Sequence, residues 1–270
     1  MTHERDNSYR GMRKYIVKLL SCIILFGILF GCVNQLAAGE FIQVRSLIQA
    51  ILGNGPWSHM WFLYRLLGIY LCMPLLSAFT VHASRRDQVV LVGTLFLFFF
   101  LCPFVSGWLG YYVTNVMPVE GIWLFYVLAG ALLGGVSLKT LKKYGWIALT
   151  GTFVGTAGIL IVGIWQGTDY IFSEAHPLTL LLAVSLFAAA RILWGGKPSR
   201  LFLGKLAANS LGVYIIHPVF IHACVLLLGF NPQVWLPVFM VPLTVLIIFA
   251  VSEAVVYLLR QIPLITKYLF

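Results

Sequence analysis

Eight long apolar segments follow one another along the 270 residues of this chain, and only short polar loops separate them. A helix needs about 20 predominantly apolar residues to cross the hydrocarbon core of a bilayer, and there it satisfies its backbone hydrogen bonds internally. The predicted spans cover residues 16–33, 57–81, 89–108, 121–138, 146–165, 177–194, 206–230 and 234–259. The sequence therefore predicts an all-α integral membrane protein, a polytopic bundle of about eight transmembrane helices that forms a single transmembrane domain over residues 1–270.

The composition agrees with this class of protein and excludes others. Hydrophobic residues make up 61% of the chain and charged residues only 10%, values typical of a protein embedded in lipid. The net charge is +10, but the basic residues lie in short clusters between apolar segments, so nucleic acid is not an expected partner. The five cysteines lie in or beside apolar segments without paired spacing, which favours small buried side chains over disulfides or metal ligands.

The basic clusters predict the orientation of the chain in the bilayer. With eight spans, both termini lie on one side, and basic residues favour cytoplasmic loops. If the termini are cytoplasmic, the cytoplasmic ends carry five Lys or Arg at the start, two, three and four in the loops, and two at the end. Only Arg45 is then outside, and Arg65 lies within a span. Both termini are therefore predicted to be cytoplasmic, and the lipid bilayer is the expected partner.

Polar residues inside two of the spans are the candidates for substrate binding. Arg65 stays charged at any ordinary pH, so its position in an apolar segment costs at least roughly 2.5 kcal/mol and calls for a polar neighbour. Ser58 and Arg65 lie on one helical face, because their spacing of seven is two turns. Ser210, Tyr214 and His217 are spaced by four and three, which again places them on one face.

Two histidines and three basic loop residues allow more than one interpretation. His59 is either an interfacial residue or a base, and His217 either holds two helices together or acts as a base, because imidazole titrates near neutrality. Lys197, Arg200 and Lys205 either meet a phosphorylated cofactor or only orient the chain. No metal-ligand cluster can be assembled from the spacing, so no metal is expected.

Two stretches resemble a known family. HMWFLYRLLGIYLCMPLL (59–76) and LGKLAANSLGVYIIHPVF (203–220) are similar to two helices of the membrane acyltransferase 3 family and occur in the family's order. The resemblance implies an acyltransferase that transfers groups other than aminoacyl groups. It implies transfer of an acyl group, commonly acetyl, from acetyl-CoA or another acyl-CoA to a hydroxyl of a surface glycan or polysaccharide. The implied location is the bacterial plasma membrane, that is, the cell inner membrane.

The same resemblance leaves the catalytic base unassigned. Family members begin with a helix that carries an arginine and a histidine, and a second helix follows. This chain opens with RGMRKYIVKLL (10–20), which resembles the basic entry to the family's third helix, so we expect an N-terminally truncated member. His59 and His217 are weak candidates for the base. The alternative is a non-catalytic or degenerate member that acts as a membrane permease or scaffold.

Overall fold

The computed structural model describes residues 9–53, 55–108, 121–166, 173–196, 201–227, 229–231 and 236–269. Within these ranges every regular element is helical, which confirms the predicted all-α class. The chain divides into two compact units, one formed by Met1–Met73 with Pro198–Phe270 and the other by Pro74–Lys197. The single transmembrane domain and the cytoplasmic termini stay predictions.

Seven of the described helices are long and apolar enough to cross a membrane. They are Tyr9–Ala37, Ser58–His82, Arg85–Val105, Gly145–Trp165, Pro177–Trp194, Gly204–Val225 and Phe239–Leu259. The remaining predicted span, residues 121–138, contains a shorter apolar helix, α6 (Ile122–Gly134), of 13 residues. It stops early because Ser137 Oγ accepts a hydrogen bond from the Thr140 backbone N–H and so caps the next helix, α7 (Leu138–Lys143).

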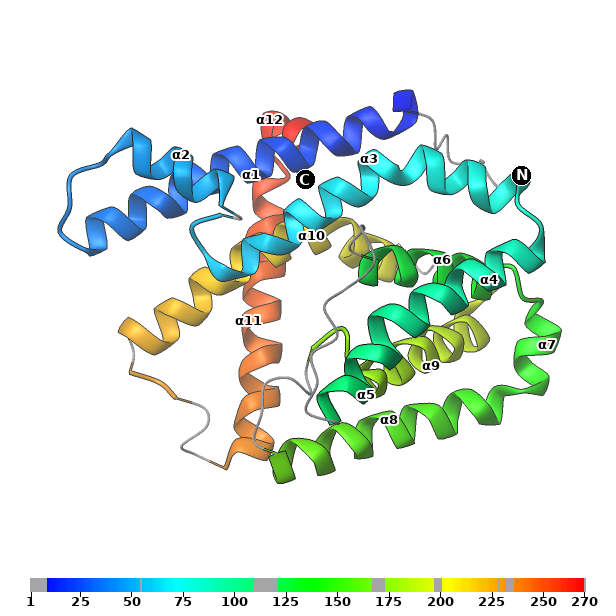
Figure 1. Ribbon diagram of the computed structural model, residues 1–270. Coiled ribbons are helices and arrows are strands. Elements are labelled where there is room, and N and C mark those ends of the chain that lie inside the picture. Colours follow the sequence, from blue (N-terminus) through cyan, green and yellow to red (C-terminus); the bar gives the residue numbers. More distant parts are fainter. Residues whose placement is uncertain are drawn as a thin grey trace. The chain divides into compact units, whose positions relative to one another are not determined.

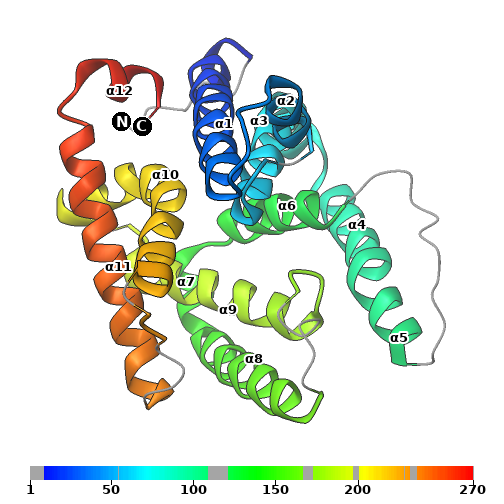
Figure 2. The ribbon, with the colours of Figure 1, turned by 90° about the vertical axis from the view of Figure 1, so that its left-hand side faces the viewer.

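The first unit is assembled from the two ends of the described chain. It contains α1 (Tyr9–Ala37), α2 (Val44–Leu52), the 3-10 helix η1 (Ser58–Met60) and the first part of α3 (Trp61–His82). It also contains α10 (Leu201–His222), the π-helical turn η4 (Ala223–Leu227), α11 (Pro237–Leu259) and α12 (Pro263–Tyr268). α10 packs along α11, and α1 packs against both α2 and α12 (Figures 1 and 2).

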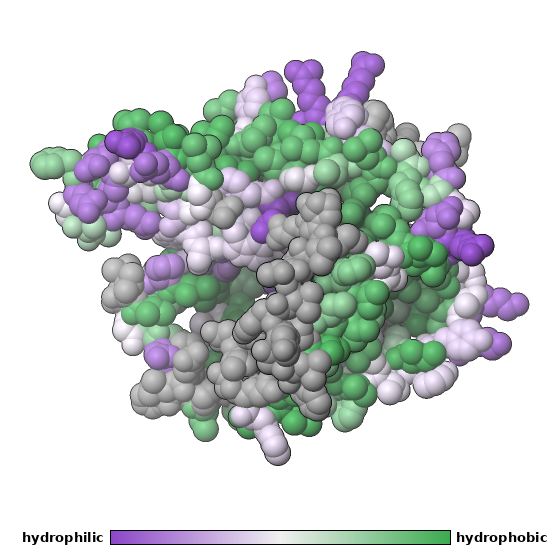
Figure 3. Space-filling view, viewed as in Figure 1, coloured by the Kyte–Doolittle hydropathy of each residue, from purple (hydrophilic) through white to green (hydrophobic). Residues whose placement is uncertain are grey.

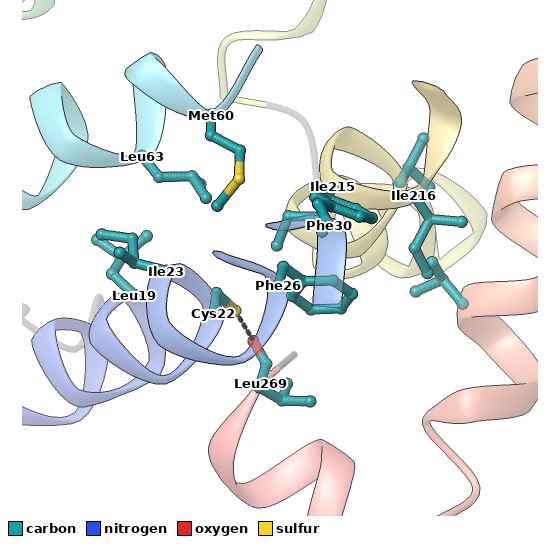
Figure 4. Packing of buried hydrophobic residues seen from close by; sticks show 12 residues of the cluster. Leu19, Cys22, Ile23, Phe26, Phe30, Met60, Leu63, Ile215, Ile216 and Leu269 are labelled. Carbon is teal, nitrogen blue, oxygen red and sulfur yellow. Dashed lines mark hydrogen bonds between the residues drawn. The ribbon is translucent and has the colours of Figure 1, made fainter. Parts of the chain in front are cut away.

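The core of this unit lies where α1, α3 and α10 meet. Side chains from all three helices interdigitate there, and Figure 4 shows them around the sulfur of Cys22. The most buried apolar members are Leu19, Cys22, Phe30, Met60, Leu63 and Ile215, together with Val256 of α11. Cys22 Sγ donates to the Leu269 carbonyl oxygen at 3.4 Å, and this cysteine is buried, as predicted for all five. The prediction is wrong for Cys72, which is exposed, and Cys32, Cys102 and Cys224 are only partly buried.

Two glycines of α1 leave space for side chains of α2 to pack closely against it. A Cβ added to Gly27 would lie 2.7 Å from Ile51 Cγ1, and one added to Gly31 would lie 2.5 Å from Leu47 Cδ2. The glycine pair and the apolar pair are both spaced by four, so each repeats on one helical face. Leu47 is buried by this contact, whereas Val44 and Leu52 are exposed. The connector after the first span thus contains an amphipathic helix held against α1.

A chain of hydrogen bonds joins four helices of the first unit. Lys18 Nζ on α1 donates to the Thr266 carbonyl on α12 at 2.9 Å, and Thr266 Oγ1 donates to the Arg260 carbonyl at 2.6 Å. Arg260 Nη1 donates to Asn209 Oδ1 on α10 at 2.7 Å, and Asn209 Nδ2 donates to Glu253 Oε1 on α11 at 2.6 Å. Asn209 is 5% exposed, so its amide contacts Arg260 and Glu253 away from solvent, while Glu253 Oε2 has no hydrogen-bond partner among the described residues.

The second unit contains the middle of the chain. From Pro74 onward α3 belongs to it, followed by α4 (Arg85–Phe96), a π-helical turn (Leu97–Leu101) and α5 (Cys102–Trp108). After α6 and α7 come α8 (Gly145–Gln166) and α9 (Pro177–Trp194), which lie side by side in Figures 1 and 2. The bounds of α9 are those predicted from the sequence. The buried apolar cluster of the second unit contains Leu95, Phe99, Phe100, Phe125, Leu128 and Leu180.

A small residue allows two helices of this unit to pack closely, and basic residues bind the end of a third. A Cβ at Gly155 would lie 3.1 Å from the Leu182 backbone, so this glycine allows the close approach of α8 to α9. Arginines add side-chain donors to backbone carbonyls at and just after the end of α6, where backbone N–H groups already bond to the Leu132 and Leu133 carbonyls. Arg85 Nη2 donates to the Leu132 carbonyl at 3.1 Å, and Arg191 Nη1 donates to the Val136 carbonyl at 3.1 Å.

The described surface is strongly apolar. Exposed side chains on α8 include Phe153, Ile164 and Trp165, which are 74%, 82% and 87% exposed. On the face seen in Figure 3, hydrophobic side chains cover large continuous areas and the most hydrophilic ones gather in separate groups. Such a surface is favourable in hydrocarbon and unfavourable in water, which agrees with a protein embedded in a bilayer.

Candidate functional site

The segment that leads into α3 is fastened to the end of α1 by a tryptophan. The Trp57 indole stacks on Phe30 with ring centroids 4.0 Å apart and on His222 of α10 at 4.8 Å. Trp57 Nε1 donates to Asn34 Oδ1 at 2.9 Å, and Asn34 Nδ2 donates to the Pro56 carbonyl at 3.2 Å. Both faces of the indole are therefore occupied by other rings, and the backbone of η1 is held in place.

This arrangement places His59 against Tyr214 and His217, two residues of the family-like stretch 203–220. The His59 ring lies 5.7 Å from the Tyr214 ring and 5.8 Å from the His217 ring, both in T-shaped geometry. The Tyr214 hydroxyl donates a hydrogen bond to the His59 backbone carbonyl. The ring of Phe62, one turn beyond His59, lies 5.3 Å from the Tyr214 ring. We call His59, Tyr214 and His217 the His59 site.

The two imidazoles of the His59 site have different surroundings. His217 Nδ1 lies 2.7 Å from the Tyr214 carbonyl oxygen and 3.2 Å from that of Val213, both in its own helix. His59 Nε2 is buried and has no hydrogen-bond partner among the described residues. A buried nitrogen without a partner costs free energy unless a ligand or water pairs with it. The site therefore contains a buried polar atom that is open to a further hydrogen bond.

The other predicted site residues lie outside these contacts. Ser58, Ser210 and Arg65 are exposed, and Ser210 Oγ donates to the Ala207 carbonyl of its own helix at 2.9 Å. Arg65 follows His59 by six positions, which is about 9 Å along α3. Lys205 is exposed near the start of α10, and Lys197 and Arg200 lie outside the described residues.

Sequence reasoning missed the aromatic frame of the site. Phe30, Asn34 and Trp57 position η1, but Phe30 and Asn34 belong to the first span, where they resemble ordinary helix residues. The proximity of Trp57 to His59 along the chain was the one available signal. In the part of the chain that the structure describes, no group of three or more His, Cys, Asp or Glu side chains is placed to hold a metal ion.

The opposite end of the first unit is basic. Arg10, Arg13 and Lys14 are exposed on the first turns of α1, and Arg260 joins α11 to the same region through the contacts of Lys18 and Thr266. Lys205 lies one turn before Asn209, the partner of Arg260. Between Lys14 and Phe30 α1 rises about 24 Å, so the cationic end and the His59 site lie at opposite ends of this helix.

Comparison with known families agrees with the motifs that build this site. The acyltransferase 3 family model, described as "Acyltransferase domain", matches residues 2–258, which include both motifs and all the helices of the first unit except α12. Neither a curated protein nor a solved structure matches the chain. A match over this much of the chain identifies the family, and the chain therefore belongs to the membrane acyltransferase 3 family.

Proposed function

We propose that the protein transfers an acyl group, acetyl in the first instance, from an acyl-CoA to a hydroxyl of a surface glycan or polysaccharide at the bacterial plasma membrane. Family membership supports acyl transfer in general. In the proposed reaction the acceptor oxygen attacks the thioester carbonyl carbon, a C–O bond forms and the C–S bond breaks. The hydroxyl proton passes to a base and then to the leaving thiolate sulfur, so the products are an ester and free CoA.

The distance along α1 between the basic residues at its start and the His59 site near its end supports an acyl-CoA donor and a hydroxyl acceptor. The exposed Arg10, Arg13 and Lys14 favour the phosphates of a CoA donor, and Lys205 with the predicted Lys197 and Arg200 would add to the same attraction. The His59 site lies about 24 Å away along α1, and its buried His59 Nε2, which has no hydrogen-bond partner among the described residues, would pair with an uncharged hydroxyl. An elongated thioester with its phosphates at one end fits this arrangement.

The proposed substrate-binding residues are Arg65, Ser58, Tyr214 and Ser210. Arg65 would steady an anionic group or the oxyanion that develops on the thioester carbonyl, because a fixed guanidinium stabilises such charge. Tyr214 would contact the substrate through its ring, since its hydroxyl already donates to the His59 carbonyl. Ser58 and Ser210 are exposed hydroxyls near the two motifs and would contact the acceptor.

The test measures ester groups on the glycan. Surface glycan from cells with and without the gene is compared by NMR, and membranes are supplied with acyl-labelled CoA. We expect O-acyl signals and label transfer only where the protein is present. An unchanged ester signal together with no label transfer would contradict the proposal and favour the non-catalytic permease or scaffold.

A further inference from the structure

A proline inside α10 leaves a backbone carbonyl without its usual donor. Pro218 has no N–H, so the carbonyl of residue 214, four positions earlier, cannot receive the normal helical hydrogen bond. The preceding residue uses this carbonyl instead. His217 Nδ1 lies 2.7 Å from the Tyr214 carbonyl oxygen and 3.2 Å from the Val213 carbonyl oxygen.

These two contacts decide which nitrogen of His217 carries the proton. A carbonyl oxygen only accepts hydrogen bonds, so Nδ1 must be the donor. In the neutral imidazole the other nitrogen, Nε2, then holds the lone pair. We propose that Pro218 and the Tyr214 carbonyl fix His217 as the Nδ1–H tautomer, and that His217 Nε2 is the proton acceptor for the hydroxyl substrate.

Tyr214 has two roles in this arrangement, one through each of its oxygens. Its carbonyl fixes the tautomer of His217, and its hydroxyl donates to the His59 carbonyl. The rings of His59 and His217 lie 5.8 Å apart at 70°, which limits the rotation of His217. Tyr214 and Pro218 are therefore positioning residues, because they act through His217 rather than on the substrate.

The inference rests on the proposed acyl transfer and assigns its proton path. The acceptor O–H donates to His217 Nε2, and the proton moves to that nitrogen as the oxygen bonds to the acyl carbon. The imidazolium then returns the proton from Nε2 to the sulfur that leaves as the C–S bond breaks. Nδ1–H stays bonded to the Tyr214 carbonyl throughout, and its positive charge in the intermediate is stabilised by the two carbonyl oxygens.

The first experiment measures the tautomer directly, without any substrate. Full-length protein with ¹⁵N-labelled histidine is studied by NMR in lipid nanodiscs at a pH where the rings are neutral, and the His217 signals are assigned by their loss in His217→Gln. We expect a protonated Nδ1 and an unprotonated Nε2. Pro218→Ala restores an N–H that competes for the Tyr214 carbonyl, so a second population with protonated Nε2 should appear. A protonated Nε2 in the unaltered protein would overturn the inference.

The second experiment measures acyl transfer with Pro218→Ala, with the matched control Pro242→Ala. Pro242 is also inside a helix of the same unit, α11, but Val241 precedes it, so no histidine depends on the carbonyl that it frees. Removing a proline from a helix interior favours folding, so both variants should have a raised Tm. Only Pro218→Ala should lower kcat, by roughly tenfold and with little change in KM, because general base catalysis requires the free lone pair.

The outcomes separate this inference from the proposed function. His217→Gln should lower kcat by roughly a hundredfold or more, within the range for loss of a general base. If His217→Gln or Pro218→Ala transfers acyl groups at the unaltered rate, the proton path is wrong although the acyltransferase remains. If the unaltered protein transfers no acyl group, the proposed function fails and the catalytic role fails with it, whatever tautomer the NMR shows.

Discussion

The Tyr214 hydroxyl donates a hydrogen bond to the backbone carbonyl of His59, a residue 155 positions earlier in the chain. This contact joins α10 to η1, the short helix that leads into α3, and it unites the two segments whose sequences resemble the acyltransferase 3 family. The same tyrosine contacts the ring of His59 and the Nδ1 of His217. It is therefore the residue through which the two motifs become one site.

Replacing Tyr214 with phenylalanine should loosen this connection without removing the ring. The His59 carbonyl would lose its donor, so we expect a loss of about 1 kcal/mol in the free energy of unfolding. Acyl transfer should fall by several-fold because His59 would be less well positioned. Thermal unfolding in detergent and label transfer from acyl-CoA measure the two effects. If Tyr214→Phe is as stable and as active as the unaltered protein, the Tyr214 hydroxyl does not position His59.

Replacing Arg65 with leucine should separate activity from folding. Arginine costs at least roughly 2.5 kcal/mol in an apolar span, so leucine should be inserted into the membrane at least as well. Acyl transfer should fall by more than tenfold if the guanidinium steadies negative charge. Arg45→Leu, on α2, removes a basic residue outside the predicted spans and serves as the control. Full activity in Arg65→Leu would leave the arginine with a packing role only.

The packing of α2 on α1 can be tested by adding one methyl group at Gly31. Gly31→Ala places a Cβ 2.5 Å from Leu47 Cδ2 and should destabilise the protein by about 1–3 kcal/mol, as overpacking does. Gly130→Ala is the matched control, because nothing lies within 4 Å of a Cβ at that position. Combining Gly31→Ala with Leu47→Ala should recover part of the loss. Independent, additive losses in the double variant would contradict a direct contact.

Asn209 should be among the most sensitive polar residues of the first unit. Its side chain donates to Glu253 and accepts from Arg260, so Asn209→Leu removes a partner from two charged groups. We expect a loss on the order of 2–3 kcal/mol in the free energy of unfolding, since hydrogen bonds to charged groups are stronger than neutral ones. Ser210→Ala, at the neighbouring exposed position, should leave stability unchanged. Chemical unfolding followed by circular dichroism compares the two variants, and equal stabilities would contradict the role of the network.

His176 should make the stability of the second unit depend on pH. Burial lowers the pKa of His176 below its ordinary value of 6.5, and its Nδ1 accepts a hydrogen bond from the Leu178 N–H at 3.2 Å, which caps α9. Below pH 6.5 the unfolded chain binds the proton first, so stability is fully present above 6.5 and declines as the pH falls through the lowered folded-state pKa.

His176→Asn tests this dependence because asparagine keeps a capping oxygen but does not titrate. Thermal unfolding between pH 5 and 8, the range over which an unperturbed imidazole changes charge, should show a smaller acid loss in this variant. If both proteins lose the same thermal stability at low pH, a group other than His176 causes the loss. A capping contribution is also expected to survive in His176→Asn at neutral pH.

The order of the residues alone determined the helical class, the positions of most spans and the family. Long apolar runs permit only helices in a bilayer, and the bounds of α9 match the predicted residues 177–194. Local spacing also placed Ser210, Tyr214 and His217 on one face, because the pitch of a helix is a local property. The apolar surroundings of the cysteines predicted buried side chains, which holds for Cys22 but not for Cys72, because burial depends on which face of a helix meets a neighbour.

Only the tertiary structure decided which helical faces meet. Periodicity shows that a residue faces a neighbour, but the identity of that neighbour depends on how small and large side chains fit between helices far apart in the chain. The pairing of Tyr214 with His59, the packing of α2 against Gly27 and Gly31, and the Asn209 network all arise in this way. The sequence supplied the histidines, and the packing of α1, α3 and α10 placed them together.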